Sequence, residues 1–406
     1  MGCVLKALLL ENLHPDATKI LASRGIEVVT RTGALDEDEL VDTLDGVHIL
    51  GIRSKTHVTQ RVLEAGKDLL TLGAFCIGTN QIDLKSAAGQ GVAVFNAPFS
   101  NTRSVVEIAI ANIISLVRRQ PVFDKDMHAG VWNKTAIGAH EIRGKTLGII
   151  GYGNIGTQLS VLAENLGMSV IFYDISEKLA LGNARRAGSL DELLSIADVV
   201  TLHVDGRPTN NGIFGAEQFA AMKPGAIFLN LARGFVVDVD ALAEALKAGH
   251  IAGAAVDVFP QEPKRKGDAF TSPLQGLSNV ILTPHTAGST EEAQEAIGQF
   301  VSHKILDYLG TGSTTLSVNL PNLALATNNG AARIAYLHHN TPGVLARVNN
   351  ILADHGENIE GQLLATRGEL GYVVTDIGSE IEPETITALE AIEQTVRLRV
   401  LHGPQH

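Results

Sequence analysis

The chain has 406 residues, of which 45% are hydrophobic and 19% charged, and its formal charge is −12. This length allows two or three domains with large cores, and the acidic balance argues against general nucleic-acid binding. No run of eighteen apolar residues occurs and only two cysteines are present, so we expect a cytoplasmic protein without a membrane span, a disulfide framework or a metal site.

The first hundred residues alternate between predicted strands and helices. Strands are expected at 5–10, 27–30, 48–52, 69–75 and 92–96, with helices at 15–24 and 36–44. The third strand ends in Arg53-Ser54-Lys55-Thr56. Two cations therefore follow the carboxyl end of a strand, which is where open α/β sheets bind ligands. A long helix is expected at 104–118.

A complete βαβ unit is predicted between residues 145 and 174. The apolar strand 147–150 leads into a GxGxxG turn formed by Gly151, Gly153, Asn154, Ile155 and Gly156. Glycines at these places suit a tight turn, close approach of a pyrophosphate and close packing of helix on strand. Asp174 ends the second strand, at 170–173, where a carboxylate binds the ribose of NAD and repels the 2′-phosphate of NADP, and Ile175 offers no Arg to hold that phosphate. The alternative is a structural turn in an unrelated α/β domain.

Four later strands, at 199–203, 226–230, 252–256 and 279–282, each end in polar residues. Beyond the last three lie Arg233, Glu262 and His285, which together suit hydride transfer from a 2-hydroxy acid. His285 would take the hydroxyl proton, Glu262 would raise the pKa of that imidazole, and Arg233 would hold a carboxylate. Taken singly, each residue could instead be an ordinary loop residue, a solvated acid or a helix cap.

The final part of the chain follows a helix at 290–309 that returns to the first unit. Strands at 333–338, 359–366, 372–377 and 396–401, with helices at 343–355 and 382–393, give the ferredoxin-like order. We therefore predict an α/β protein with two Rossmann-like, doubly wound parallel-sheet domains and a C-terminal ferredoxin-like α+β domain. The predicted boundaries are 1–100 with 288–329, a discontinuous substrate domain; 101–287, a dinucleotide domain; and 330–406.

Several motifs resemble those of the D-isomer-specific 2-hydroxyacid dehydrogenases. They are the GxGxxG turn, residues 231–234, 257–263 and 283–285. Residues 52–56, 75–81 and 95–103 are similar to the members that oxidise 3-phosphoglycerate, the first step of phosphorylated serine synthesis. The last domain resembles an ACT domain, a regulatory module that binds amino acids.

The resemblance implies a role for each matching residue. Arg233, Glu262 and His285 would be catalytic, and Arg53, Ser54, Lys55 and Asn101 would bind substrate. NAD would contact Gly151, Gly153, Asn154, Ile155, Gly156, Asp174, Leu231, Ala232, Arg233, Asp257, His285, Thr286, Ala287 and Gly288. L-serine, as effector, would contact His338, Asn340 and Asn358. Trp132 matches a residue that reaches a neighbouring subunit, which implies a homotetramer, although it could equally be a local anchor.

The chain departs from the family in two places. Thr286-Ala287-Gly288 replaces an apolar residue and two glycines, and Gly330-Ala331-Ala332 replaces a Gly-Gly pair at the regulatory boundary. Two other functions stay open: reduction of another 2-oxo acid such as 2-oxoglutarate, and a non-catalytic, NAD-responsive interaction protein. The complete Arg-Glu-His set favours an enzyme over the second.

Overall fold

The computed structural model describes residues 4–263, 267–326 and 331–402. It divides into two compact units, of which the second is Phe99–Ala293 and the first contains the chain before and after it. The predicted boundary at residue 330 lies outside the described residues, and the division into three domains stays a prediction. Among the helices of the described ranges, none is long and apolar enough to cross a membrane.

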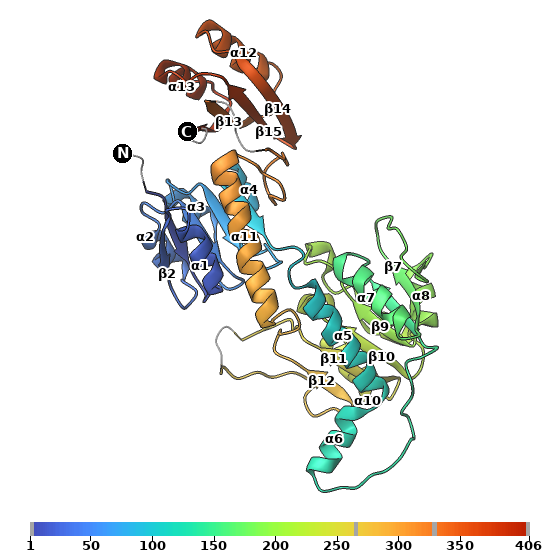
Figure 1. Ribbon diagram of the computed structural model, residues 1–406. Helices are drawn as coiled ribbons and strands as arrows, with labels where there is room; N and C mark the ends of the chain where they lie inside the picture. Colours follow the sequence, from blue (N-terminus) through green and yellow to red (C-terminus); the bar gives the residue numbers. More distant parts are fainter. Residues whose placement is uncertain (1–3, 264–266, 327–330, 403–406) are drawn as a thin grey trace. The chain divides into compact units, whose positions relative to one another are not determined.

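The first unit contains a five-stranded parallel sheet. Its order is β2 (Glu27–Thr30), β1 (Lys6–Leu9), β3 (Ile49–Ile52), β4 (Thr71–Ala74) and β5 (Ala93–Asn96). Helices α1 (Pro15–Ala22) and α11 (Glu291–Thr311) pack on one face. Helices α2 (Glu37–Thr43), α3 (Gln60–Ala65) and α4 (Leu84–Gly89) pack on the other. Helix α11 returns the chain to the first unit after the second unit is complete, as the sequence predicted (Figure 1).

The second unit is a seven-stranded parallel sheet with helices on both faces (Figure 1). Its order is β12 (Val280–Leu282), β11 (Ile251–Val256), β10 (Ala226–Asn230), β9 (Val199–Leu202), β6 (Thr146–Ile150), β7 (Ser169–Tyr173) and β8 (Arg185–Arg186). Helices α5 (Thr102–Val117) and α7 (Asn154–Asn165) cover one face, and α8 (Leu190–Ile196), α9 (Ala216–Ala221) and α10 (Val239–Lys247) the other. The strand order reverses between β6 and β9, and such a reversal creates a ligand-binding crevice.

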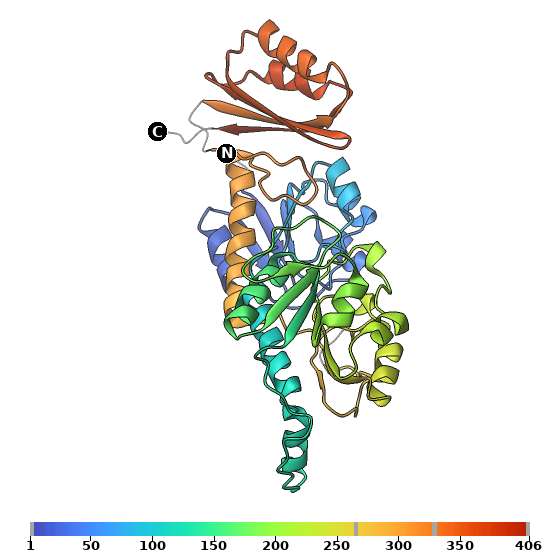
Figure 2. The same cartoon turned by 90° about the vertical axis from the view of Figure 1, so that its right-hand side faces the viewer.

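The C-terminal part forms a four-stranded antiparallel sheet in the order β14 (Ile359–Arg367), β15 (Leu370–Ile377), β13 (Ala332–His339) and β16 (Thr395–His402). Helices α12 (Val344–Asp354) and α13 (Pro383–Glu390) lie on one face of this sheet (Figure 2). Apolar side chains of β13 and β15 meet those of both helices there. The predicted fold class is confirmed in all three parts.

Candidate active site

The Gly-rich turn after β6 requires glycine at two positions and leaves space at a third. Gly151 has a φ of 92°, and an added Cβ would lie 2.7 Å from the carbonyl oxygen of His203. At Gly156 a Cβ would collide with the carbonyl oxygen of Gly151. Nothing lies within 4 Å of a Cβ added at Gly153, just before α7 begins at Asn154. A pyrophosphate therefore fits against the first N–H groups of α7.

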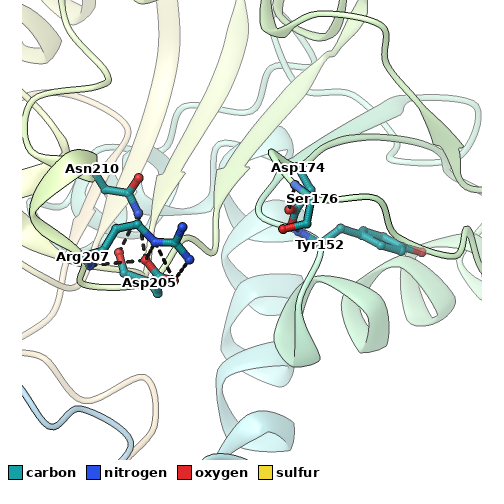
Figure 3. A network of polar contacts seen from close by, with 6 residues as sticks. All are labelled: Tyr152, Asp174, Ser176, Asp205, Arg207 and Asn210. Atoms are coloured by element: carbon teal, nitrogen blue, oxygen red, sulfur yellow. Dashed lines mark hydrogen bonds and ion pairs between the residues drawn. The ribbon is translucent and has the colours of Figure 1, made fainter. Parts of the chain in front are cut away.

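Asp174 is fixed at the end of β7 by the backbone. Its Oδ2 accepts a hydrogen bond from the N–H of Tyr152 at 2.9 Å, and its Oδ1 accepts one from the N–H of Ser176 at 2.8 Å (Figure 3). Each carboxylate oxygen has a second lone pair, so the group can still accept hydrogen bonds from a ribose. The residues of this turn thus fit a dinucleotide.

His285 and Glu262 form a hydrogen-bonded pair. The imidazole Nδ1 lies 2.8 Å from Glu262 Oε2, and the side chains are 49% and 35% exposed. The pKa of His285 is raised, first by this hydrogen bond and then by the carboxylate charge, against burial and the charge of Arg233. Burial acts to raise the pKa of Glu262, but the bond and charge of His285 outweigh it and lower that pKa. Nδ1–H therefore points at the carboxylate, which leaves Nε2 as the basic atom.

A buried carboxylate shapes the turn that carries His285. Asp257 is 1% exposed, and its oxygens accept hydrogen bonds from Thr283 Oγ1 at 2.5 Å, the Thr286 N–H at 2.8 Å and the Ala287 N–H at 2.9 Å. The Asp257 carbonyl oxygen also accepts from the N–H of His285, whose φ is 56°. Asp257 thus positions His285, and its predicted contact with NAD stays a prediction.

Arg233 is held by its backbone while its guanidinium forms no ion pair within the described residues. Buried Asn230 donates to the Arg233 carbonyl at 3.1 Å and accepts from the Ala232 N–H at 3.1 Å. Within the part of the chain that the structure describes, the side chain donates to the Ala232 carbonyl alone, at 2.8 Å. It does not cap a helix by a side-chain hydrogen bond. Its charge lowers the pKa of both Glu262 and His285, so the three predicted residues are close together.

Gly234 allows the Arg233 segment to approach the Glu262 segment. A Cβ added at Gly234 would lie 2.6 Å from Phe259 Cα and closer still to the Phe259 carbonyl group. Phe259 in turn donates its N–H to Glu262 Oε1 at 3.1 Å. The sequence reasoning assigned no role to Asn230 or Gly234. The role of Gly234 could have been inferred from its place directly after Arg233, because glycine is often used where two backbone segments approach closely.

The predicted substrate loop of the first unit is organised by Glu11, which the sequence reasoning missed. This residue is 8% exposed, and its carboxylate accepts hydrogen bonds from the N–H groups of Arg53 at 3.2 Å, Lys55 at 3.1 Å and Thr56 at 2.8 Å. Gln81 adds a bond from its Nε2 to the Arg53 carbonyl at 2.6 Å. The exposed Ser54 and Lys55 are thus presented on a fixed backbone.

Asn101, the remaining predicted substrate residue, lies in the second unit at the start of α5. Its Oδ1 is buried and has no hydrogen-bond partner among residues 4–263, 267–326 and 331–402. A Cβ at Gly288 would lie 3.0 Å from Asn101 Cγ. Gly288 therefore gives this amide its space, and the unpaired acceptor can receive a hydrogen bond from a ligand.

The three predicted effector residues differ in accessibility. His338 is 3% exposed, and its Nδ1 lies 2.9 Å from the His339 carbonyl oxygen. Its buried Nε2 has no hydrogen-bond partner among the described residues. Asn340 and Asn358 are exposed. Trp132, the predicted subunit contact, is 79% exposed.

Comparisons with known proteins agree with this geometry. Residues 110–287 match the model "D-isomer specific 2-hydroxyacid dehydrogenase, NAD binding domain", and residues 334–397 match "AHAS small subunit-like ACT domain". D-3-phosphoglycerate dehydrogenase of Haemophilus influenzae is 49% identical over 98% of this chain and 97% of its own. D-3-phosphoglycerate dehydrogenase 2 of Saccharomyces cerevisiae is 47% identical over 98% of this chain and 88% of its own.

A solved structure of D-lactate dehydrogenase from Aquifex aeolicus, complexed with NAD and lactic acid, is 27% identical. It has a TM-score of 0.66 and covers 74% of this chain and 95% of its own. The predicted cofactor, NAD, and the predicted class of enzyme, an NAD-dependent D-2-hydroxyacid dehydrogenase, are confirmed. The chain therefore belongs to the D-isomer specific 2-hydroxyacid dehydrogenase family, among its D-3-phosphoglycerate dehydrogenases.

Proposed function

We propose that the chain oxidises 3-phospho-D-glycerate with NAD to 3-phosphohydroxypyruvate, the first step of phosphorylated L-serine biosynthesis. The observation that carries this proposal is the Glu262–His285 pair, 2.8 Å apart, beside an arginine without an ion pair among the described residues. Relatives named for this activity match along nearly the whole chain. We place this enzyme in the cytoplasm.

His285 performs the proton step. Its Nδ1–H is held by Glu262, so Nε2 takes the proton of the substrate hydroxyl as the reaction proceeds. The imidazolium that results is stabilised by the Glu262 carboxylate, which accepts the Nδ1–H bond throughout. In the reverse direction the same atom returns the proton. The pair thus works as an acid or a base according to the direction of the reaction.

Arg233 binds the carboxylate of the substrate next to the reacting carbon. A guanidinium presents paired donors that match a carboxylate, and the absence of a competing carboxylate bond leaves them available. We assign the phosphate to the side chains of Arg53, Ser54 and Lys55. Glu11 occupies the backbone N–H groups of Arg53, Lys55 and Thr56, so these three groups do not bind the phosphate and the side chains of the loop remain for it.

NAD is held by the Gly-rich turn, by Asp174 and by the segment that ends at Gly288. The bound nicotinamide supplies the hydride acceptor. Gly153 and Asn154 give the pyrophosphate its approach to α7, and Asp174 accepts the ribose hydroxyls. The contacts proposed for Leu231, Ala232 and residues 285–288 follow the family pattern.

The proposal is tested by NADH oxidation with 3-phosphohydroxypyruvate and, separately, with 2-oxoglutarate. We expect a clear preference for the phosphorylated substrate. Turnover of 2-oxoglutarate alone would assign the chain to another 2-oxo acid. Turnover of neither, by folded protein that binds NADH, would contradict the proposed function and favour an interaction protein.

We also propose that L-serine inhibits the enzyme by binding the domain at 330–406. Exposed Asn340 and Asn358 offer donors and acceptors for a zwitterion, and Gly343, with a φ of 89°, precedes the first N–H groups of α12. His338 is buried, so we assign it a structural role at the end of β13 and not a direct contact with serine. Calorimetry on wild type and Asn340→Ala tests the site, because no serine binding by wild type would reject it.

We propose that the active form is a homotetramer. In each subunit, residues 1–100 and 288–329 form one domain, residues 101–287 the second and residues 330–406 the third. Two exposed apolar regions support self-association. Trp132 and Ile137 are 79% and 80% exposed, and the outer strand β14 exposes Leu363 and Leu364 by 50% and 46%. Edge strands and apolar patches of this kind are usually covered by a partner. Sedimentation of Trp132→Ala and Leu363→Asp measures the contribution of each region, and a monomeric wild type would reject the assembly.

A further inference from the structure

The loop that follows β9 lies beside Arg233. Strands β9 and β10 pair in parallel, so the segments at their carboxyl ends are neighbours. Arg233 follows β10, whereas Asp205, Gly206 and Arg207 follow β9. A Cβ added at Gly206 would lie 3.4 Å from Arg233 Nε and 3.8 Å from Arg233 Cγ, which are ordinary contact distances. The backbone of this loop therefore runs along the side chain that we assign to the substrate carboxylate.

Asp205 places an acid next to this arginine. The pKa of its carboxyl group is lowered, first by the side-chain hydrogen bonds of Arg207 and last by the charge of Arg233. Arg233 itself forms no ion pair within the described residues. A carboxylate so near would be expected to pair with it, because bonds between a guanidinium and a carboxylate are strong and often forked. A competing partner for Asp205 is therefore needed to keep Arg233 free.

Arg207 and Asn210 are that competing partner (Figure 3). Nε of Arg207 lies 2.7 Å and 3.0 Å from the two carboxylate oxygens of Asp205, and Nη2 lies 2.5 Å from Oδ2. Asn210 donates from Nδ2 to Asp205 Oδ1 and to the Asp205 carbonyl oxygen, each at 3.0 Å. Both carboxylate oxygens are thus occupied within one short loop.

The ion pair of this loop has no evident role in stability. The side chains of Arg207 and Asp205 are 48% and 56% exposed, and exposed pairs usually contribute little to the free energy of folding. The motifs shared with the family include neither residue. An effect of the pair is therefore expected locally, at the Arg233 side chain that the loop contacts.

We propose that Arg207 is a positioning residue for substrate binding: together with Asn210 it occupies Asp205, and so leaves the Arg233 guanidinium free for the carboxylate of the substrate. The proposal rests on the role given to Arg233 in the proposed function, but it does not depend on which 2-hydroxy acid is oxidised. Without Arg207, the Asp205 carboxylate would either pair with Arg233 or remain as an unpaired negative charge beside it. Either state disfavours a bound anion.

Binding of oxamate in the presence of NADH, measured by calorimetry, tests this. Oxamate has the carboxylate and carbonyl groups of a 2-oxo acid but no phosphate, so it reports on Arg233 and not on the loop of Arg53 and Lys55. Arg207→Gln should weaken oxamate binding about tenfold, the usual value of one charge-assisted contact, while the affinity for NADH stays that of wild type. Adding Asp205→Asn should restore oxamate binding, because the competing acid is then gone.

Arg185→Gln is the matched control. Arg185 also forms an exposed ion pair, with Glu192 at 2.6 Å, but it lies in β8, at the edge of the sheet beyond β7. Its replacement should leave oxamate binding unchanged. Arg207→Lys keeps the positive charge and should keep most of the affinity, and this result would support the proposal even if Arg207→Gln folded poorly.

Arg233→Gln separates this proposal from the proposed function. Loss of oxamate binding in Arg233→Gln but not in Arg207→Gln would overturn the role of Arg207 and leave that of Arg233 intact. A loss in Arg207→Gln that Asp205→Asn did not reverse would also overturn it, because the acid would then not be the cause. Unchanged binding in Arg233→Gln would contradict the role of Arg233 itself, and with it the proposal made for Arg207.

Discussion

Replacing Gly234 with alanine should disturb stability and catalysis together. The added Cβ would lie 2.6 Å from Phe259 Cα and closer to the Phe259 carbonyl group, which are backbone atoms that cannot rotate away. The segments carrying Arg233 and Glu262 must therefore separate. Overpacking of this kind costs about 1–3 kcal/mol, or roughly 2–12 °C in the melting temperature of a 150–250-residue unit. A misplacement of about 1 Å at a catalytic group can lower turnover about a hundredfold.

Calorimetry and steady-state rates of Gly234→Ala measure the two effects. Gly215→Ala is the control, because its Cβ would meet nothing nearer than Gln218 Oε1 at 3.8 Å and its φ of −131° suits alanine. We expect the control to keep the turnover of wild type. If Gly234→Ala melted and turned over like wild type, the close approach of the two segments would not position Arg233 and Glu262.

Four further predictions concern the catalytic pair and the loop assigned to the phosphate. His285→Gln should lower turnover about 10²–10⁴-fold while NADH binding, followed by fluorescence, persists. Glu262→Gln removes the partner that raises the pKa of His285, so the base form persists to lower pH and the acidic limb of kcat/KM moves down; an unmoved limb would contradict the assignment. The same variant should lose unfolding free energy mostly at about pH 5–6, where both charges exist, and less as pH rises through the raised pKa of His285. Lys55→Ala should raise KM about tenfold or more for 3-phosphohydroxypyruvate but not for 2-oxoglutarate, and equal effects would assign Lys55 to the carboxylate or to solvent.

The sequence predicted the fold because its periodic segments are long and its turns carry clear signals. The apolar strand 147–150, the GxGxxG turn and Asp174 lie within thirty residues of one another, so their spacing alone defines the unit. The C-terminal order of strands and helices was equally clear. The short helices α3, α4, α8, α9 and α10 were not predicted, because six to nine residues give a weak helical period. Helices α1 and α2 are equally short but were predicted, and α2 has an additional signal in its acidic first turn. Helix α6 (Gln120–His128) buries none of its side chains, so it shows no apolar pattern.

The residues that position the site were harder to find than the reacting groups. Arg233, Glu262 and His285 each follow a strand, and the carboxyl ends of parallel strands lie at one edge of the sheet. Glu11 instead acts on a loop more than forty residues away, and Gly234, after β10, lies against Phe259, which follows the neighbouring strand β11. Such contacts depend on the order of strands in the sheet, which local patterns do not contain.

An acidic protein that binds an anion must keep its carboxylates away from the ligand, and this chain does so by binding them to its own backbone. Glu11 accepts three backbone N–H groups beneath the loop of Arg53 and Lys55, and Asp257 accepts two beneath the turn of His285. Each acid is at most 8% exposed, so its charge is satisfied internally. Meanwhile Arg233 has no carboxylate partner within the described ranges. The net charge of −12 is therefore compatible with anion binding, because the buried acid beneath each of these two loops is already satisfied by backbone N–H groups of the same loop.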